Sequence, residues 1–155
     1  MEYLVRAARV TDIDRFVALS AATTRPDGTA TPLGAADLLR QLVYLPQASV
    51  LIAEAQRTIV GGAILALRPS VRVGGYIGTI DLLVVDPAYD VERIGEALVD
   101  ELLRSARNKG CTVVEAAAPD DPTTLKRWQG MGFAAAGPKI ERIVTSSGRA
   151  GRTTR

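Results

Sequence analysis

The sequence of 155 residues contains no histidine and one cysteine, Cys111. Histidine is the commonest metal ligand and the usual proton carrier near neutral pH, so its absence excludes zinc hydrolases and the Ser-His-Asp and Cys-His mechanisms. A lone cysteine excludes an internal disulfide, a four-thiolate zinc site and a paired redox motif. Any catalysis must therefore depend on carboxylates, tyrosines, backbone groups or a cofactor, and we expect no bound metal.

Long apolar runs are also missing. No stretch approaches the roughly 18 to 20 consecutive apolar residues that cross a bilayer. Glu2 and Arg6 lie where a secretory signal would need a basic start followed by an apolar segment. We therefore expect a cytoplasmic protein that has no membrane partner.

An excess of charge of one sign is absent too, since 19 basic residues face 17 acidic ones and the net charge is +2. Arg149, Arg152 and Arg155 lie in residues 146–155, which contain no acidic residue and no apolar residue except Ala150. This composition predicts a disordered basic tail over 146–155. The rest of the chain is nearly neutral, which argues against a nucleic-acid surface.

Apolar residues make up 47% of the chain and charged residues 23%, the balance of a soluble globular protein. The length suits one domain, which we expect over residues 1–145. Hydrophobic periodicity predicts alternating strands and helices within it. The predicted strands are Tyr3–Arg6, Ser49–Glu54, Thr58–Leu67, Tyr76–Val85, residues 112–117, and a closing hairpin of Phe133–Ala136 and Ile140–Thr145.

The predicted helices follow a capping box at Thr11 and Asp14, cover Asp37–Leu45 and Glu92–Lys109, and run from Asp121-Pro122 to near Gly130. Short connections indicate an antiparallel meander over residues 49–85. The helix over 92–109 then joins two strands in a central β-α-β unit with parallel pairing. The expected fold class is therefore α/β (α+β), a mixed and mostly antiparallel sheet with flanking helices. Neither Gly61-Gly62 nor Gly74-Gly75 precedes a helix, so both pairs are predicted to serve turns or bulges.

Two segments resemble a known family. The run Ile80-Asp81-Leu82-Leu83-Val84-Val85-Asp86-Pro87-Ala88-Tyr89 leads into the long predicted helix, and Trp128-x-x-x-Gly132-Phe133 spans the end of the last one. Together with the order of elements over residues 2–145, they resemble the GNAT superfamily of acyl-CoA-dependent N-acetyltransferases. The resemblance implies acetyl-CoA as co-substrate, a primary amine of a small molecule or protein as acceptor, and a homodimer as a plausible assembly.

In this family a glycine-rich turn binds the pyrophosphate of coenzyme A, because the free N–H groups at a helix N-terminus attract anions. The family's turn reads Arg or Gln, two residues, Gly, one residue, then Gly or Ala. This chain has Asp90-Val91-Glu92-Arg93-Ile94-Gly95, which retains only the last glycine and adds two carboxylates that repel phosphate. Arg93 would bind a phosphate if it turned inward and would be a solvated residue if it turned outward.

Two neighbouring strands that splay apart would leave N–H and C=O groups free to pair with the pantetheine arm, much as with an added strand. A backbone N–H of the strand that contains Asp81 would hold the oxyanion. The cofactor-binding residues implied by the resemblance are Leu83, Val84, Val85, Val91, Glu92, Arg93, Ile94, Gly95 and Glu96.

An attacking amine must lose a proton, and its ordinary pKa is near 10.4. Asp81 is the best candidate base, because its strand is expected to run under the thioester. Glu54, which we expect on an adjacent strand, is the second choice. The alternative is that Asp81 faces solvent or forms a structural ion pair.

Family members often use a tyrosine of the last helix to protonate the thiolate, but that position holds Trp128, whose indole is not an acid in this pH range. Tyr76 and Tyr89 remain as candidate acids. Asp121 takes the place of a frequent asparagine or is simply the helix N-cap. Cys111 is better explained as a small buried residue than as a nucleophile.

The leading hypothesis is therefore a GNAT-type N-acetyltransferase. The altered turn and Trp128 favour a rival, a catalytically inactive GNAT-like binding or regulatory module. A second rival is nucleic-acid binding through the basic tail, although three charges without interleaved aromatic residues are a weak signal.

Overall fold

The computed structural model describes residues 2–20, 34–137, 140 and 142. The described residues fall into two compact units, one up to Ala117 and one from Ala118 onward. The predicted tail over 146–155 lies outside the described residues. In the described part of the chain, no helix combines the length and apolar character that a bilayer crossing needs.

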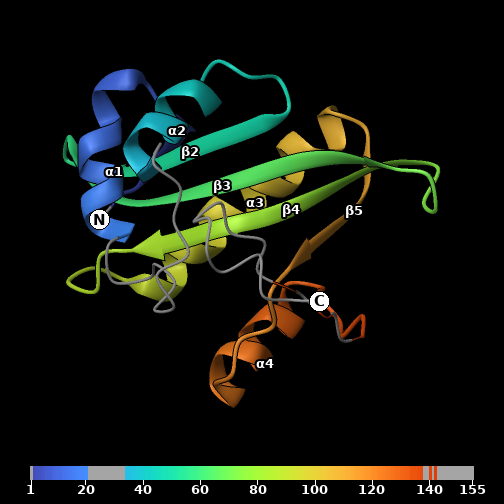
Figure 1. The fold of residues 1–155 in the computed structure, drawn as a ribbon. Coiled ribbons are helices and arrows are strands. Elements are labelled where there is room, and N and C mark those ends of the chain that lie inside the picture. Colours follow the sequence, from blue (N-terminus) through green and yellow to red (C-terminus); the bar gives the residue numbers. More distant parts are fainter. Residues whose placement is uncertain (1, 21–33, 138–139, 141, 143–155) are drawn as a thin grey trace, which may run out of the picture. The chain divides into compact units, whose positions relative to one another are not determined.

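The first unit contains a five-stranded sheet with the strands in sequence order (Figure 1). Its strands are β1 (Leu4–Ala7), β2 (Ala48–Ala55), β3 (Thr58–Ser70), β4 (Gly75–Val85) and β5 (Cys111–Ala116). The pairings from β1 through β4 are antiparallel, and β4 pairs with β5 in parallel. The expected mixed, mostly antiparallel sheet with a β-α-β unit is confirmed.

Helices cover both faces of this sheet (Figure 1). A short 3₁₀ turn, η1 (Val10–Asp12), leads into α1 (Ile13–Ser20), and α2 (Gly34–Leu42) follows. On their face of the sheet, one cluster of buried side chains joins the helices to the strands: Ile13, Phe16, Leu39, Val50, Ile52, Ile64 and Val84.

On the opposite face lies α3 (Val91–Asn108), which connects β4 to β5. The predicted helix is confirmed, and one face of it is apolar and buried, with Ile94, Leu98, Leu102 and Ala106. A helix with one apolar face is stabilised mainly by burying that face, here against the sheet.

The pair Gly61-Gly62 serves close packing rather than a turn. A Cβ at Gly61 would lie 3.2 Å from the side chain of Ile94 on α3, and a Cβ at Gly62 would lie 2.6 Å from the ring of Phe16 on α1. The pair does adjoin a register shift between β2 and β3. Gly74, by contrast, occupies the predicted turn with φ of 77°.

The start of the first helix differs from the prediction of a capping box at Thr11 and Asp14. The turn already begins at Val10, and the Asp12 carboxylate accepts a 2.7 Å hydrogen bond from the Arg9 N–H. Helical structure therefore begins before Thr11, the residue predicted to cap it. The capping side chain is Asp12, which lies within the first turn.

Asp12 belongs to a partly buried ion-pair network that links β1, η1 and β2. Arg6 donates to Asp12 at 2.8 Å and to Glu54 at 2.9 Å. The hydrogen bond from Arg6 holds the pKa of Asp12 below its usual range, against the opposing effect of burial. The two carboxylates in turn raise the pKa of Arg6, chiefly through the bond to Asp12.

The second unit contains α4 (Pro122–Gly130). Asp121 is its N-cap, as predicted, and Trp128 packs edge-on against Phe133 with ring centroids 4.8 Å apart. The predicted strand Phe133–Ala136 is wrong, because residues 133–137 have no regular secondary structure. The other predicted strand of the hairpin, Ile140–Thr145, lies mostly outside the described residues.

Candidate active site

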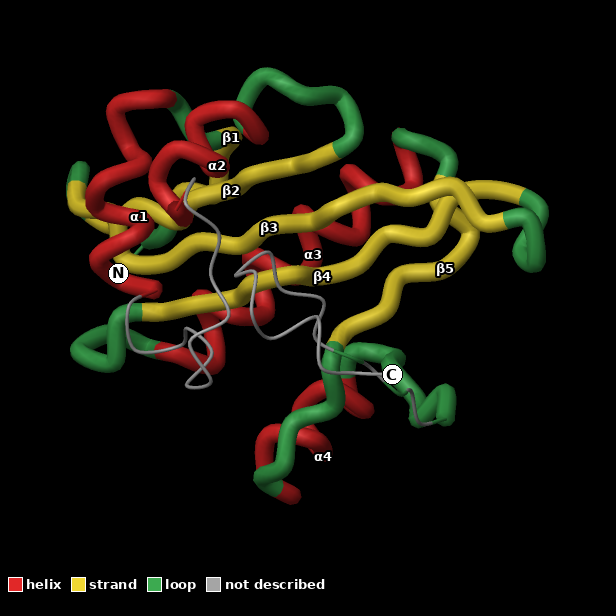
Figure 2. Tube along the Cα trace, viewed as in Figure 1, coloured by secondary structure: helices red, strands yellow, loops and turns green. Residues whose placement is uncertain are grey.

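The sheet forks between β4 and β5. Their parallel pairing extends from Tyr76 opposite Cys111 to Ile80 opposite Ala116. Beyond that point β4 continues to Val85 and stays paired with β3, whereas β5 ends at Ala116 (Figure 2). We call this end of the β4–β5 pairing the fork. Among the described residues, no β5 backbone pairs with residues 81–85, so this edge of β4 is open. An unpaired strand edge is thus present, because β5 ends there; a splay of two continuing strands stays a prediction.

Asp81 lies at the fork, and a β-bulge places it there. Leu65 of β3 is opposite Ile80, whereas the neighbouring Ile64 is opposite Leu82, so Asp81 is the extra residue on β4. A bulge redirects a side chain and increases the local twist, and bulges are frequent beside active sites. Asp81 is exposed, and no ion pair or hydrogen bond of its carboxylate is found among the described residues.

A second carboxylate, that of Glu115, lies across the fork on β5. Glu115 pairs in register with Thr79 of β4 and accepts a 3.2 Å hydrogen bond from its hydroxyl. Arg68 of β3 donates to the same oxygen at 3.4 Å. Sequence reasoning missed Glu115, because a charged residue on an exposed strand position carries no distinctive signal. The fork therefore has one engaged carboxylate and one that faces solvent.

The turn after β4 is fixed by Asp86. Its backbone N–H donates to the Val60 carbonyl at 2.8 Å, and its carboxylate accepts from the Ala88 N–H at 3.0 Å. Arg15 of α1 forms a 3.2 Å ion pair with the same side chain. The Asp-Pro pair signals the local turn, but no local pattern could reveal a partner as distant in sequence as Arg15.

The first turn of α3 is capped by its own side chain. Asp90 is the N-cap, and its carboxylate accepts a 3.1 Å hydrogen bond from the Arg93 N–H. The Arg93 guanidinium lies over the ring of Tyr3, 5.3 Å from its centroid. Of the two orientations left open for Arg93, the structure thus shows one directed at β1. The N-cap signal of Asp90 was visible in the sequence but was not used.

The nine residues expected to bind the cofactor divide between these two places. Leu83 and Val85 are half-buried and Val84 is buried in the open segment of β4, where only their backbone edge is available. The other six form the beginning of α3: Val91, Glu92, Arg93, Ile94, Gly95 and Glu96.

Within that helical stretch, two residues have opposite surroundings. The Ile94 side chain is fully buried, so it contributes to the core and only its backbone remains for any ligand. A Cβ added at Gly95 would meet nothing within 4 Å. The fold itself therefore does not require this glycine.

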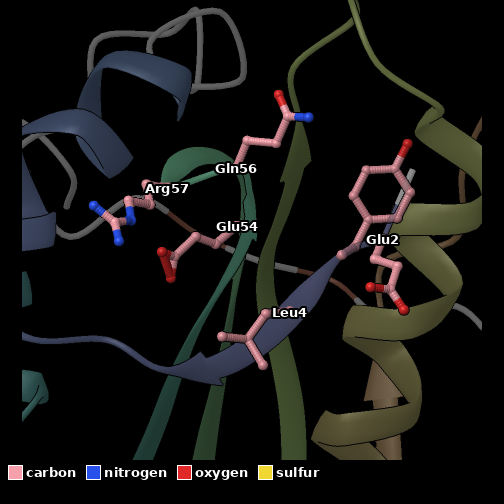
Figure 3. Close-up of a pocket in the computed structure, with 6 residues that line it drawn as sticks. Glu2, Leu4, Glu54, Gln56 and Arg57 are labelled. Carbon is pink, nitrogen blue, oxygen red and sulfur yellow. The ribbon is translucent and has the colours of Figure 1, made fainter.

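Glu54, the second-choice base, is not adjacent to β4. It lies on β2, which β3 separates from β4, and its carboxylate is paired with Arg6. Glu54 also lines an open groove of about 410 Å³ at the start of β1. Figure 3 shows the lining side chains spread around this strand, with Glu2 turned away from Glu54 and Arg57. The expected adjacency was wrong because the meander places one strand between them.

The candidate acids and Cys111 lie at different distances from the fork. Tyr76 is the second residue of β4, five residues before Asp81, which is about 16 Å along an extended chain. Tyr89 lies half-buried in the turn held by Asp86. Burial raises the pKa of the Cys111 thiol, which disfavours the thiolate that a nucleophile needs.

In the second unit, Asp121 acts as a helix cap. Its carboxylate accepts hydrogen bonds from the Thr124 hydroxyl at 2.7 Å and the Thr124 N–H at 3.1 Å, and these lower its pKa. The Trp128 backbone carbonyl accepts a 3.2 Å hydrogen bond from the Phe133 N–H, in addition to the ring contact. The Gly-Phe marker thus closes the end of α4.

The acetyltransferase (GNAT) family model matches residues 13–133. The chain belongs to the GNAT family. A glucosamine 6-phosphate N-acetyltransferase from Trypanosoma brucei brucei is 43% identical over 54 residues, which are 34% of this chain and 37% of that protein. The chain thus aligns with little more than a third of this curated relative's length.

Solved structures of GNAT acetyltransferases share the fold over almost the whole chain. An acetyltransferase from Trypanosoma brucei has a TM-score of 0.73 at 24% identity, covering 92% of this chain and 100% of that one. A glucosamine-6-phosphate N-acetyltransferase from Arabidopsis thaliana has a TM-score of 0.75 at 16% identity, covering 94% and 100%. The forked sheet of this GNAT protein therefore occurs in a fold shared with acetyl-transferring enzymes.

Proposed function

We propose that this GNAT protein transfers an acetyl group from acetyl-CoA to a primary amine, within a domain spanning residues 1–145. The observation that carries the proposal is that three features lie together on β4: the fork, the unpaired backbone edge of residues 81–85 and the bulged Asp81. The donor's thioester supplies an activated acyl carbon and a thiolate leaving group. The chain must bind this donor, place the amine and remove a proton from it.

The open edge of β4 suits the pantetheine arm. An amide-bearing ligand can pair with unused strand N–H and C=O groups in the manner of an added strand. Residues 81–85 are such a segment. Backbone N–H groups at Leu83, Val84 or Val85 would then stabilise the negative charge that develops on the carbonyl oxygen.

Asp81 is the proposed base. Its solvent-facing carboxylate at the fork would accept the proton that a primary ammonium must lose, directly or through one water. Glu115, already bonded to Thr79 and Arg68, would contribute to the electrostatic attraction of a cationic acceptor. A thiol with a pKa near 8.5 can leave as the thiolate and take its proton from water, so Trp128 in place of a tyrosine is compatible with turnover.

The experiment is a thiol-release assay with acetyl-CoA and a panel of primary amines. Amino-sugar phosphates come first, because the curated relative is named for glucosamine 6-phosphate. Asp81→Asn should lower kcat by about 10²- to 10⁴-fold, the usual contribution of a general base. Asp100→Asn, an exposed charge change further along α3, is the matched control and should retain full activity.

The rival function is a catalytically inactive GNAT-like module, which the capped turn at Asp90 favours. It predicts no thiol release for any amine, whether or not coenzyme A binds. Equal rates for Asp81→Asn and the wild type with an accepted amine would instead remove Asp81 from the mechanism. The same proposal predicts that the protein is located in the cytoplasm, forms a homodimer and does not bind nucleic acid through its tail.

A further inference from the structure

The N–H groups of the first turn of α3 already bind an anionic group, the carboxylate of the chain's own Asp90. Free N–H groups at a helix N-terminus are what a bound phosphate uses. Here the Asp90 carboxylate accepts from the Arg93 N–H at 3.1 Å, and the Asp90 carbonyl accepts from the Ile94 N–H at 3.0 Å. A diphosphate at this place would have to displace a carboxylate that is covalently tethered beside it.

The charged side chains within this turn are unfavourable for a diphosphate. Glu92 adds a carboxylate in the same turn, and it is exposed. Arg93 is the cation of the turn, but its guanidinium lies over the Tyr3 ring, where a cation–π contact stabilises it. The turn therefore presents two carboxylates near the place where a diphosphate would bind, while its arginine is directed at β1.

The segment that suits pantetheine is unaffected by these charges. It is the strand backbone of residues 81–85, and the pantetheine arm is uncharged. Binding of the arm and binding of the diphosphate are thus separable in this chain, since the first depends on β4 and the second on α3.

We infer that Asp90 is an internal competitor for the donor's diphosphate, so that this protein recognises its acyl donor chiefly through the pantetheine arm. The inference rests on the proposed function and deepens it. The donor class is a pantetheine thioester, and the diphosphate of coenzyme A contributes little to affinity. Asp90 is a specificity-determining residue, because it determines whether the diphosphate contributes to the affinity for the donor.

The test compares dissociation constants of coenzyme A and pantetheine by isothermal titration calorimetry, which needs no acceptor. Two variants separate the effect of charge from that of capping. Asp90→Asn keeps an N-cap but removes the charge, and Asp90→Gly leaves the Arg93 N–H without a side-chain acceptor at small cost to helix stability. Asp100→Asn is the matched control. It removes one exposed charge from the same helix about 15 Å away, beyond the screening length of about 8 Å at physiological salt.

For the wild type we expect dissociation constants for the two ligands within about threefold of each other. Asp90→Gly should bind coenzyme A about tenfold more tightly, Asp90→Asn should show an intermediate gain, and pantetheine affinity should be unchanged in both. Circular dichroism and a thermal melt establish that each variant is folded.

Wild-type protein that binds coenzyme A a hundredfold more tightly than pantetheine would overturn the inference and leave the proposed function intact. Unchanged coenzyme A affinity in both folded Asp90 variants would overturn it equally. Absence of binding of either ligand to any of the proteins would instead reject the proposed function, and the inference with it.

Discussion

Gly62→Ala tests the packing of the helix layer that contains α1. A Cβ at Gly62 would lie 2.6 Å and 2.7 Å from two ring carbons of Phe16, a side chain that is fully buried. Ordinary carbon contacts are about 3.5 to 4.0 Å, so the overlap is about 1 Å. Because the atoms belong to a rigid ring in the core, the ring or the strand must shift.

Overpacking of this kind costs about 1 to 3 kcal/mol. Replacing glycine by alanine returns about 0.4 to 1 kcal/mol by restricting the unfolded chain. Taking the middle of both ranges, about 2 and about 0.7 kcal/mol, we expect Gly62→Ala to lower the free energy of unfolding by about 1.3 kcal/mol, measured by urea denaturation at constant m-value. Gly95→Ala is the matched control: a Cβ there meets nothing within 4 Å, and it should raise the helix's stability by up to about 1 kcal/mol.

A double-mutant cycle assigns the cost to the named contact. Phe16→Leu should be less destabilising in the Gly62→Ala background than in the wild type, with a coupling of at least about 0.5 kcal/mol. A variant Gly62→Ala as stable as the wild type, or a coupling of zero, would refute the close approach of α1 to β3.

Two further predictions concern titratable groups. Asp12→Asn should lower the free energy of unfolding at neutral pH by about 1 to 3 kcal/mol, since it removes a charged partner of Arg6. The pKa of Asp12 is lower in the folded protein than in the unfolded chain. Its stabilising contribution is therefore present above the unfolded pKa near 3.9 and is lost as the pH falls through the folded pKa. Parallel stability–pH curves for wild type and variant across that acidic range would contradict this assignment. Cys111, whose thiol pKa is raised by burial, should react with iodoacetamide at pH 8 more slowly in the folded protein than in urea; a faster reaction in the folded state would indicate an activated thiolate.

The long helix could be predicted from local periodicity, and the antiparallel neighbours in the sheet could be predicted from the short connections between strands. Ile94 and Leu98 recur at helical spacing and are buried in α3, as the pattern indicates. The short connections around β3 leave little choice but antiparallel neighbours. The predicted strand Phe133–Ala136 was wrong, because a strand needs a partner and no local pattern supplies one.

The candidate site was less accessible to sequence reasoning. The bulge that exposes Asp81 depends on the register between β3 and β4, and the pairs of Asp86 with Arg15 and Glu115 with Arg68 join distant segments. Asp90 shows a different kind of failure. The family pattern assigned it a phosphate-contacting position, whereas elementary capping chemistry predicts the bond to the helix that the structure shows.

The two glycines of β3 make the layered structure thinnest at one peptide unit. Phe16 reaches this unit from one side of the sheet and Ile94 from the other. A carbon atom added on either side would push on a strand that has no slack on the opposite side, because the interior is close-packed. The helix whose first turn carries Asp90 and the helix on the far face of the sheet therefore both pack closely on the same two glycines of β3.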